Sequence, residues 1–345
     1  MSDQDRHSRH RRFHGIGDRG QIEIASARIA IAGCGALGSR VAELLARSGV
    51  GTAPRGLLRI VDRDYVEVSN LQRQALFDDD DARQARPKAL AAELHIRRID
   101  PSVRCDAHVR DLSPANAERL LDEVDLIVDG TDNFRTRLLL NDVSLARRVP
   151  WVHGAAVASR GSVAGFIPTR GPCYRCLLGN APNLGAGETC DTAGIVAPLP
   201  SLVASMQAAF VLRWIVDGTM PAGMRFVEIW GDEPGWRTLF EDAAPDPECR
   251  SCGRGDLPAL REEHQEVVTL CGRNSVQIVT ARIADLDRAE RRLRELSPTI
   301  HRHARSVTAR LDSGALTLFD DGRIIVEGTT DPHEATSLVA RCLGG

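Results

Sequence analysis

The sequence predicts an α/β protein with a doubly wound, mostly parallel sheet, an antiparallel extension of that sheet and a small C-terminal α+β domain. Short apolar runs alternate with segments of helical periodicity between residues 28 and 153, an order typical of parallel sheets covered by helices. From Ser162 the pattern changes to antiparallel-looking strands. A polar stretch at 253–264 then separates these elements from a second set of strands and helices.

The elements of the large sheet follow from the hydrophobic pattern. Buried strands are expected where apolar residues run together, at 28–33, 57–62, 102–109, 124–129 and from 151. Helices are expected where apolar residues recur every three to four positions, at 37–48, 86–98 and 134–147. After the change of pattern we expect a mobile loop at 177–198, a helix at 202–216 and a hairpin at 225–241.

The predicted domains are a large one over 1–255, which begins with an N-terminal arm at 1–20, and a small α+β domain over 265–345. A linker at 256–264 joins them. In the small domain, strands are expected at 267–270, 275–280, 306–311, 315–319 and 323–327, and helices at 285–296 and 332–342. Asp320-Asp321-Gly322 is typical of a hairpin turn.

The bulk composition excludes several classes of function. The 345 residues carry a net charge of −3 and 4% aromatic residues, which gives no basis for nucleic-acid binding. No run approaches the roughly 18 apolar residues of a membrane span, and residues 1–19 lack the apolar core of a secretory signal. We therefore expect a cytoplasmic protein, whose nine cysteines call for a metal-binding or catalytic explanation.

The first motif is a glycine loop, Gly33-Cys34-Gly35-Ala36-Leu37-Gly38, between a predicted strand and a predicted helix. Glycines let the backbone approach a phosphate, and the helix N-terminus supplies N–H donors. The next strand ends in Asp62, which can accept hydrogen bonds from ribose hydroxyls. Together they predict a Rossmann-like nucleotide site. The alternative is a tight turn that packs a helix on a sheet.

A polar and cationic cluster follows Asp62. Ser69, Asn70 and Arg73 lie in one motif, and Lys88, the only lysine of the chain, starts a predicted helix. The phosphates of a nucleoside triphosphate need such donors, whereas the dinucleotide of a dehydrogenase does not. The cluster therefore favours ATP. The alternative is a solvated surface loop.

Asp132 and Asn133 come just after the strand predicted at 124–129. Ligands of doubly wound sheets bind at this edge, and Mg²⁺ prefers one or two carboxylates together with phosphate oxygens. Asp132 is therefore a candidate magnesium ligand. It is also a candidate N-cap for the helix at 134–147, and both roles can hold.

Two CxxC pairs, Cys173 with Cys176 and Cys249 with Cys252, predict a structural zinc site. The long gap between the pairs implies that the metal ties distant chain segments together. Four thiolates fill every tetrahedral position, so no position is left for catalysis. The alternative is two unrelated redox pairs or free thiols.

Two further features keep two interpretations each. Cys190 lies on the irregular loop. In one interpretation its thiol attacks an acyl-adenylate or carries sulfur. In the other it has no role in the reaction. The basic run at 6–12 is either a solvated tail or the source of an arginine that reaches a triphosphate across a subunit interface.

From about Arg6 to Cys252 the sequence resembles the MoeB/ThiF adenylyltransferases, relatives of ubiquitin-activating enzymes. The matching stretches include GCGALGS, DRDYVEVSNLQRQ, RPKA, DGTDNFRTR, GPCYRC, TCDTAGIVAPLP and ECRSC, in that order. The sequence departs from the family at Ala36, where many members have glycine, at His7, where tyrosine is usual, and in an insertion at 53–56. The segment from 265 is not a rhodanese domain; it resembles a small accessory domain of certain bacterial ThiF-like proteins.

The resemblance implies an ATP-dependent adenylylation of the C-terminal glycine of a ubiquitin-like sulfur-carrier protein ending in Gly-Gly, of thiamin or molybdopterin type. It implies a homodimer in which Arg9 enters the neighbouring subunit's site. In some relatives the cysteine matching Cys190 forms a covalent intermediate, and in others it is dispensable. The implied residues are Gly33, Gly35, Ala36, Gly38, Asp62, Asn70, Arg73 and Lys88 for ATP, Asp132 for Mg²⁺, and Cys173, Cys176, Cys249 and Cys252 for zinc.

Two other functions fit part of the sequence. An NAD-dependent oxidoreductase would explain the glycine loop and Asp62, but not the cluster of Asn70, Arg73 and Lys88. A non-catalytic scaffold that binds a ubiquitin-like protein has only Ala36 in its favour.

Overall fold

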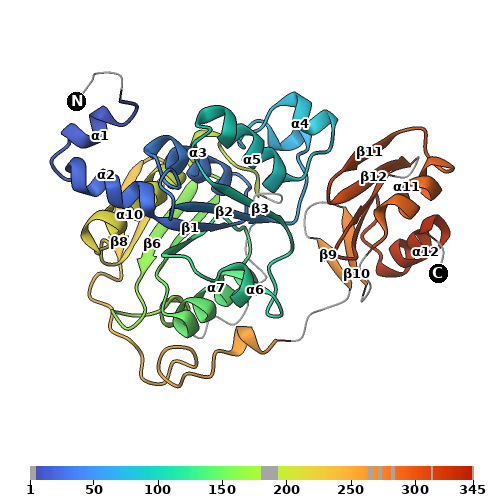
Figure 1. The fold of residues 1–345 in the computed structure, drawn as a ribbon. Coiled ribbons are helices and arrows are strands. Elements are labelled where there is room, and N and C mark those ends of the chain that lie inside the picture. The colour runs from blue at the N-terminus through green and yellow to red at the C-terminus, as the bar shows by residue number, and fades with distance from the viewer. Residues whose placement is uncertain are drawn as a thin grey trace.

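The computed structural model describes residues 5–179, 193–262, 267–270, 274–280, 284–311 and 314–343, and it contains two sheets (Figure 1). The larger sheet has eight strands in the order β3-β2-β1-β4-β5-β6-β7-β8. Its strands are β1 (Arg28–Ala32), β2 (Leu57–Asp62), β3 (Cys105–Val109), β4 (Leu126–Asp129), β5 (Trp151–Val157), β6 (Arg160–Phe166), β7 (Met224–Glu228) and β8 (Gly235–Leu239).

Strands β3, β2, β1, β4 and β5 pair in parallel, and β5, β6, β7 and β8 pair antiparallel. The predicted parallel sheet and its antiparallel extension are thus confirmed. The strand order reverses between β1 and β4, and the crevice beyond the carboxyl ends of these two strands is where doubly wound sheets bind ligands.

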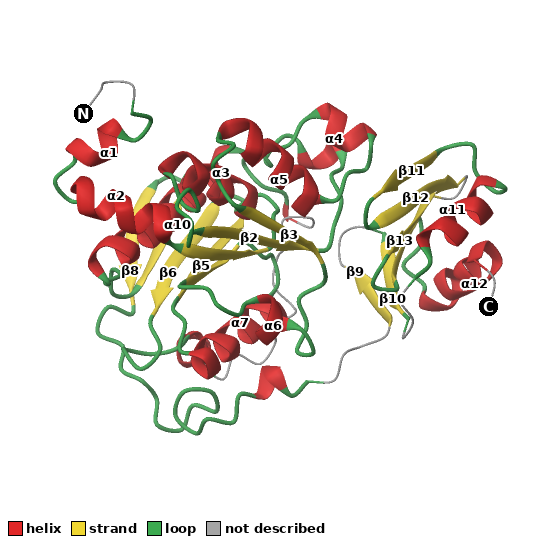
Figure 2. Cartoon of the chain, in the orientation of Figure 1, coloured by secondary structure: helices red, strands yellow, loops and turns green. Residues whose placement is uncertain are grey.

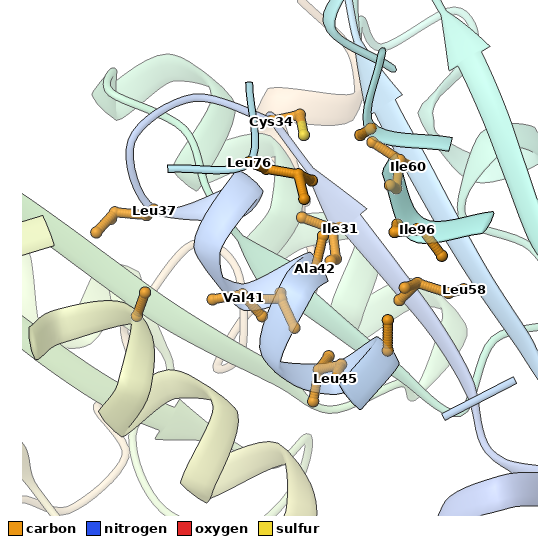
Figure 3. Packing of buried hydrophobic residues seen from close by; sticks show 14 of the residues in the cluster. Ile31, Cys34, Leu37, Val41, Ala42, Leu45, Leu58, Ile60, Leu76 and Ile96 are labelled. Carbon is orange, nitrogen blue, oxygen red and sulfur yellow. The ribbon is translucent and has the colours of Figure 1, made fainter. Parts of the chain in front are cut away.

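Helices cover both faces of the sheet, as Figure 2 shows. Helices α3 (Gly38–Ser48), α5 (Lys88–Ile99) and α10 (Pro198–Asp217) contribute to one buried apolar cluster, which Figure 3 shows around Ile31, Val41 and Leu58. Helices α6 (Ala117–Leu120), α7 (Phe134–Arg147) and α8 (Tyr174–Leu178) contribute to a second cluster. Burial of apolar side chains on both faces explains why the parallel strands are continuous apolar runs.

Helix α10 begins at Pro198, four residues before the predicted start, because proline is well tolerated in the first turn of a helix. Among the described helices, α10 alone is long and apolar enough to cross a membrane, with a mean hydropathy of 1.5. A buried core helix passes the same test, and α10 packs against α3, β5 and β6.

The predicted N-terminal arm is more ordered than expected. It forms α1 (Ser8–Arg12) and the first turn of α2 (Gly17–Ser26), whose Ile24 is buried in the first apolar cluster. The predicted loop at 177–198 is also shorter, because α8 reaches Leu178 and the backbone at Gly194 and Val196 hydrogen-bonds Ala158. Residues 180–192 lie outside the described part of the chain.

The smaller sheet is antiparallel, with the strand order β11-β12-β13-β14-β10-β9 and its own apolar core. Its elements are β9 (Val267–Leu270), β10 (Ser275–Val279), α11 (Leu286–Arg294), β11 (Ile300–His303), β12 (Ser306–Leu311), β13 (Gly314–Phe319), β14 (Arg323–Glu327) and α12 (Pro332–Leu343). The predicted C-terminal α+β fold is confirmed, with β11 as an additional edge strand.

Short elements complete the large unit: η1 (Val68–Asn70), α4 (Asp79–Arg83) and η2 (Pro258–Leu260). The last lies in the predicted linker. That segment is partly anchored, because Ala259 is buried and its N–H donates to Asp142 Oδ2 at 2.8 Å.

Candidate functional site

The glycine loop connects β1 to α3 at the carboxyl edge of the sheet. Gly33 has φ +85°, and its N–H donates to the carbonyl of Val61 at 2.8 Å. A Cβ at Gly38 would lie 1.8 Å from the Gly33 carbonyl oxygen, so the first turn of α3 fits only without a side chain there. A Cβ at Gly35 would meet only Gln74 Nε2, at 3.9 Å, which is ordinary contact.

We therefore predict opposite outcomes for two glycine-to-alanine variants. Gly38→Ala should cost at least about 3 kcal/mol of unfolding free energy, because backbone cannot move aside as a flexible side chain can. Gly35→Ala should leave stability within about 1 kcal/mol, since its Cβ has room. Urea unfolding measures both, and equal losses would show that the loop does not pack as described.

Asp62 and Lys88 meet beside the glycine loop. Asp62 ends β2 and is buried; its Oδ2 accepts from Cys34 N at 2.6 Å and its Oδ1 from Asp64 N at 2.7 Å. Lys88 begins α5 and is 2% exposed, and its Nζ lies 3.5 Å from Asp64 Oδ2. A cation and two carboxylates are thus gathered at one end of the nucleotide loop.

Burial sets the protonation of these groups. Burial raises the pKa of Asp62, and the nearby charge of Lys88 opposes that rise. Burial also raises the pKa of the Cys34 thiol well above its ordinary value, with the charge of Asp62 adding to the effect. Cys34 therefore stays protonated and packs as a small apolar residue.

The segment from Ser69 to Gln74 begins within η1. Asn70 is buried and its Oδ1 accepts from Glu67 N at 3.2 Å, while Arg73 Nη1 donates to the Ser69 carbonyl at 2.9 Å. Gln74 is 3% exposed, and its Oε1 finds no hydrogen-bond partner among the described residues. An unsatisfied polar atom beside the open position of Gly35 fits a site that receives a polar ligand.

A buried network of hydrogen bonds and ion pairs surrounds Asp129 at the end of β4, three residues before Asp132. It was not predicted from the sequence. Asp129 is fully buried and its Oδ2 is 3.2 Å from Arg137 Nε and 3.0 Å from His153 Nδ1. Its Oδ1 accepts from the backbone N–H and the hydroxyl of Thr131, at 2.9 and 2.6 Å. A carboxylate at the end of an apolar strand, with an arginine two helical turns later, is the only sequence signal of this network.

This network fixes the loop that carries Asp132. Arg137 Nη2 donates to the Thr131 carbonyl at 2.9 Å, and the backbone of the glycine loop lies against Gly130. Asn133 is the N-cap of α7, since its Oδ1 accepts from Thr136 N at 2.8 Å. The alternative role of Asp132 as the cap is therefore wrong. Asp132 is exposed.

Asp129→Asn should destabilise the fold by about 3–5 kcal/mol, because it leaves the buried charge of Arg137 unpaired. Burial would raise the pKa of Asp129, but Arg137 and His153 outweigh it and lower the pKa. Its stabilising effect is therefore present above the ordinary Asp pKa of about 3.9 and is lost as the pH falls below it.

Urea unfolding at pH 7 and at pH 3 measures this effect. The matched control is Glu123→Gln, which removes the same charge from an exposed pair with Arg28 and should cost less than about 1 kcal/mol. Equal losses of unfolding free energy in the two variants would contradict a stabilising role of the buried Asp129–Arg137 ion pair.

The four predicted zinc ligands come together. Sγ of Cys173 lies 3.8 Å from Sγ of Cys176 and 3.7 Å from that of Cys249, and Cys176 Sγ is 3.3 Å from Cys252 Sγ. Zinc–sulfur bonds of about 2.3 Å in a tetrahedron place sulfurs about 3.8 Å apart, so the set fits zinc. The prediction that two distant segments meet at one cluster is confirmed.

The cysteine cluster is bound to α7 by hydrogen bonds. The N–H of Tyr174 donates to Asn141 Oδ1 at 2.9 Å, and Ser251 Oγ donates to Asp142 Oδ1 at 2.6 Å. Asn141 and Asp142 are buried. Because α7 begins beside Asp132, a rigid helix connects the cysteine cluster with the nucleotide edge of the sheet.

Arg9 lies on α1, in the segment that follows Arg6. Arg6, in the preceding turn, contacts the Ile99 carbonyl at 2.7 Å and Asp100 at 3.3 Å, at the end of α5. Lys88 begins α5, and a 12-residue helix is about 18 Å long. Arg6 and Lys88 thus lie at opposite ends of α5. Cys190 lies outside the described residues.

A doubly wound sheet with a glycine loop at its switch point, an acidic residue at the end of β2 and a buried lysine beside both defines a nucleotide-binding α/β protein. The profile of the ThiF family matches residues 7–251, and this chain belongs to the ThiF family.

Similar proteins agree with this assignment. The chain is 38% identical over 345 residues to the sulfur carrier protein ThiS adenylyltransferase of Bacillus subtilis, covering 98% of this chain and 99% of that one. It is 36% identical to the sulfur carrier protein adenylyltransferase of Thermus thermophilus, covering 75% and 93%, and 34% identical to the SAMP-activating enzyme E1 of Haloferax volcanii, covering 75% and 92%.

Among solved structures, MccB of E. coli superposes with a TM-score of 0.62 at 21% identity, covering 73% of this chain and 75% of that one. This likeness shows the fold of the large unit. The match to the Bacillus subtilis protein, in contrast, extends through the small C-terminal unit as well.

Proposed function

We propose that this chain is an ATP-dependent nucleotidyltransferase that adenylylates the C-terminal glycine of a ubiquitin-like sulfur-carrier protein. The gathering of Lys88, Asp62 and Asp64 at the glycine loop carries the proposal. A buried lysine at the phosphate end of the site matches a triphosphate better than a dinucleotide. The names of the relatives supply the acceptor, since they act on ThiS, SAMP and other sulfur carriers.

In the proposed reaction the carrier's C-terminal carboxylate attacks the α-phosphate of ATP in line. A bond forms between the carboxylate oxygen and the α-phosphorus, the bond to the bridging oxygen breaks, and pyrophosphate leaves. The carboxylate is already ionised at pH 7, so no general base is needed. Catalysis then depends on positioning and on neutralising charge.

The residues divide this work. The glycine loop and Asp62 hold the nucleoside and the adjacent phosphate, and Lys88 with Arg73 neutralises the phosphates. Lys88 is suited to this role, because Asp64 fixes its ammonium group at 3.5 Å in a buried position. Asp132 is exposed beside the same edge and would hold Mg²⁺, which adds positive charge at the phosphates.

Three further parts of the proposal concern assembly and the fate of the adenylate. A homodimer would bring Arg9 to the partner's nucleotide. In support, Arg6, three residues before Arg9, contacts the end of α5 opposite Lys88, about 18 Å along the helix. Cys190 would attack the acyl-adenylate, so that a thioester forms, the acyl–phosphate bond breaks and AMP leaves, or it would carry sulfur. The protein would act in the cytoplasm, with zinc held by the four clustered cysteines.

The test is carrier-dependent exchange of labelled pyrophosphate into ATP, with thiamin-type and molybdopterin-type Gly-Gly carriers. Exchange with one carrier, lost when the carrier's final glycine is deleted, is the expected result and names the pathway. ATP binding without exchange for any carrier would favour a scaffold. Binding of NAD in place of ATP would favour the oxidoreductase alternative.

A further inference from the structure

The small C-terminal sheet contacts the large unit next to the nucleotide loop. Figure 1 shows it beside β3, and the contacts involve the residues that follow the carboxyl ends of β2 and β3. Arg110 Nη1 lies 2.7 Å from Asp320 Oδ1, in the turn between β13 and β14. Phe319 and Ile325 of the small sheet are buried in the same apolar cluster as the core of the large unit.

Arg323 is the most buried charged residue at this contact. It begins β14, is 3% exposed, and its Nε donates to Asp321 Oδ2 at 2.8 Å. Its guanidinium lies over the Phe319 ring, 4.3 Å from the centroid. Its two outer nitrogens cross to the large unit, where Nη1 donates to the Arg63 carbonyl and Nη2 to the Val109 carbonyl, each at 3.3 Å.

The Arg63 carbonyl belongs to the peptide group that also orients Asp62. That planar group carries the carbonyl oxygen of Arg63 on one side and the N–H of Asp64 on the other. Arg323 donates to the oxygen, and the N–H donates to Asp62 Oδ1 at 2.7 Å. A cation that polarises the carbonyl strengthens the donor at the other end of the peptide group.

The same turn also positions Lys88. The carbonyl of Asp64 accepts from Lys88 N at 2.8 Å, and the Asp64 carboxylate lies 3.5 Å from Lys88 Nζ. One rotation of the peptide group between residues 63 and 64 would therefore displace both Asp62 and the first turn of α5. The contact with Arg323 opposes that rotation.

We propose that the C-terminal unit completes the nucleotide site, and that Arg323 is a positioning residue that acts on Asp62 and Lys88 through the peptide group between Arg63 and Asp64. The inference rests on the proposed function, because it assigns ATP to the site that Asp62 and Lys88 form. It gives the small unit a part in ATP binding without any contact of its own with the nucleotide.

The test is a double-mutant cycle in the full-length chain, with the dissociation constant of ATP measured by calorimetry. Arg323→Met should raise this constant about tenfold, as expected for loss of a charge-assisted hydrogen bond. In an Asp62→Ala background the same change should have a clearly smaller effect, because one of the two groups on which Arg323 acts is already lost and only its effect on Lys88 remains. Arg323→Lys should restore part of the affinity, since an ammonium can still donate to the Arg63 carbonyl.

Arg305→Met is the matched control, because Arg305 pairs with Asp320 in the same turn but makes no bond to the Arg63 carbonyl. It should change ATP binding by less than about twofold. Equal effects of Arg323→Met in both backgrounds, or of Arg323→Met and Arg305→Met, would overturn the inference. If Arg323→Met does not fold, the cycle with Arg323→Lys decides by the same criterion. A wild-type chain that binds no ATP would instead refute the proposed function.

Discussion

Lys88→Met should reduce carrier-dependent pyrophosphate exchange by about 10²–10³-fold, as expected when one charged donor to a transferring group is removed. The ammonium of Lys88 lies 3.5 Å from Asp64, and Lys88 is 2% exposed. Because the residue is buried, water that enters the variant cannot replace the lost charge. The loss should appear in both the affinity for ATP and the rate of exchange. Steady-state kinetics with the cognate carrier measure it.

Lys88→Arg is the informative companion variant. A guanidinium keeps the charge but needs more room and a planar arrangement of acceptors, which the packed start of α5 does not offer. We expect it to regain less than about a tenth of the lost activity. Near-normal exchange in Lys88→Met would show that the phosphates are neutralised elsewhere.

Loss of the metal from the cysteine cluster should be the largest change in stability. We expect one zinc per chain in the purified protein and, in Cys249→Ser, loss of that zinc together with a fall in Tm of at least about 10 °C. The reason is that the metal joins two chain segments that close a loop of 76 residues and that hold α7 through Asn141 and Asp142. Metal analysis and thermal unfolding measure the two effects.

Cys105→Ser is the control, because Cys105 is partly buried but lies outside the cluster. It should retain zinc and shift Tm by no more than about 4 °C. A Cys249→Ser protein that keeps its metal and its Tm would contradict a structural zinc site.

The parallel core could be predicted from the sequence because its strands are buried on both faces. The predictions at 57–62 and 134–147 coincide with β2 and α7, because the apolar run of β2 ends at Asp62 and the helical pattern of α7 begins directly after its N-cap, Asn133. The strands predicted at 102–109 and 124–129 begin later, at Cys105 and Leu126. Their first residues are turn or loop, which an apolar pattern does not separate from a strand.

Other features depend on contacts that are distant in the sequence. Helix α2 contains two glycines and has only one large apolar residue among its buried positions, so its pattern does not indicate a helix. The glycine loop, Asp62 and the cysteine pairs carry local signals of their chemistry, and the structure brings each set together. Arg323 carries none, because in a chain with 44 basic residues, of which one is lysine, an arginine marks no particular site.

The solitary lysine has a practical consequence for chemical labelling. Lys88 is the only side-chain amine in the sequence, and it is 2% exposed. Acylating reagents that target amines therefore find no lysine side chain on the surface to modify. The extent of Lys88 acylation, read as a single mass increment on one peptide, would report the opening of this site and its occupancy without any engineered probe.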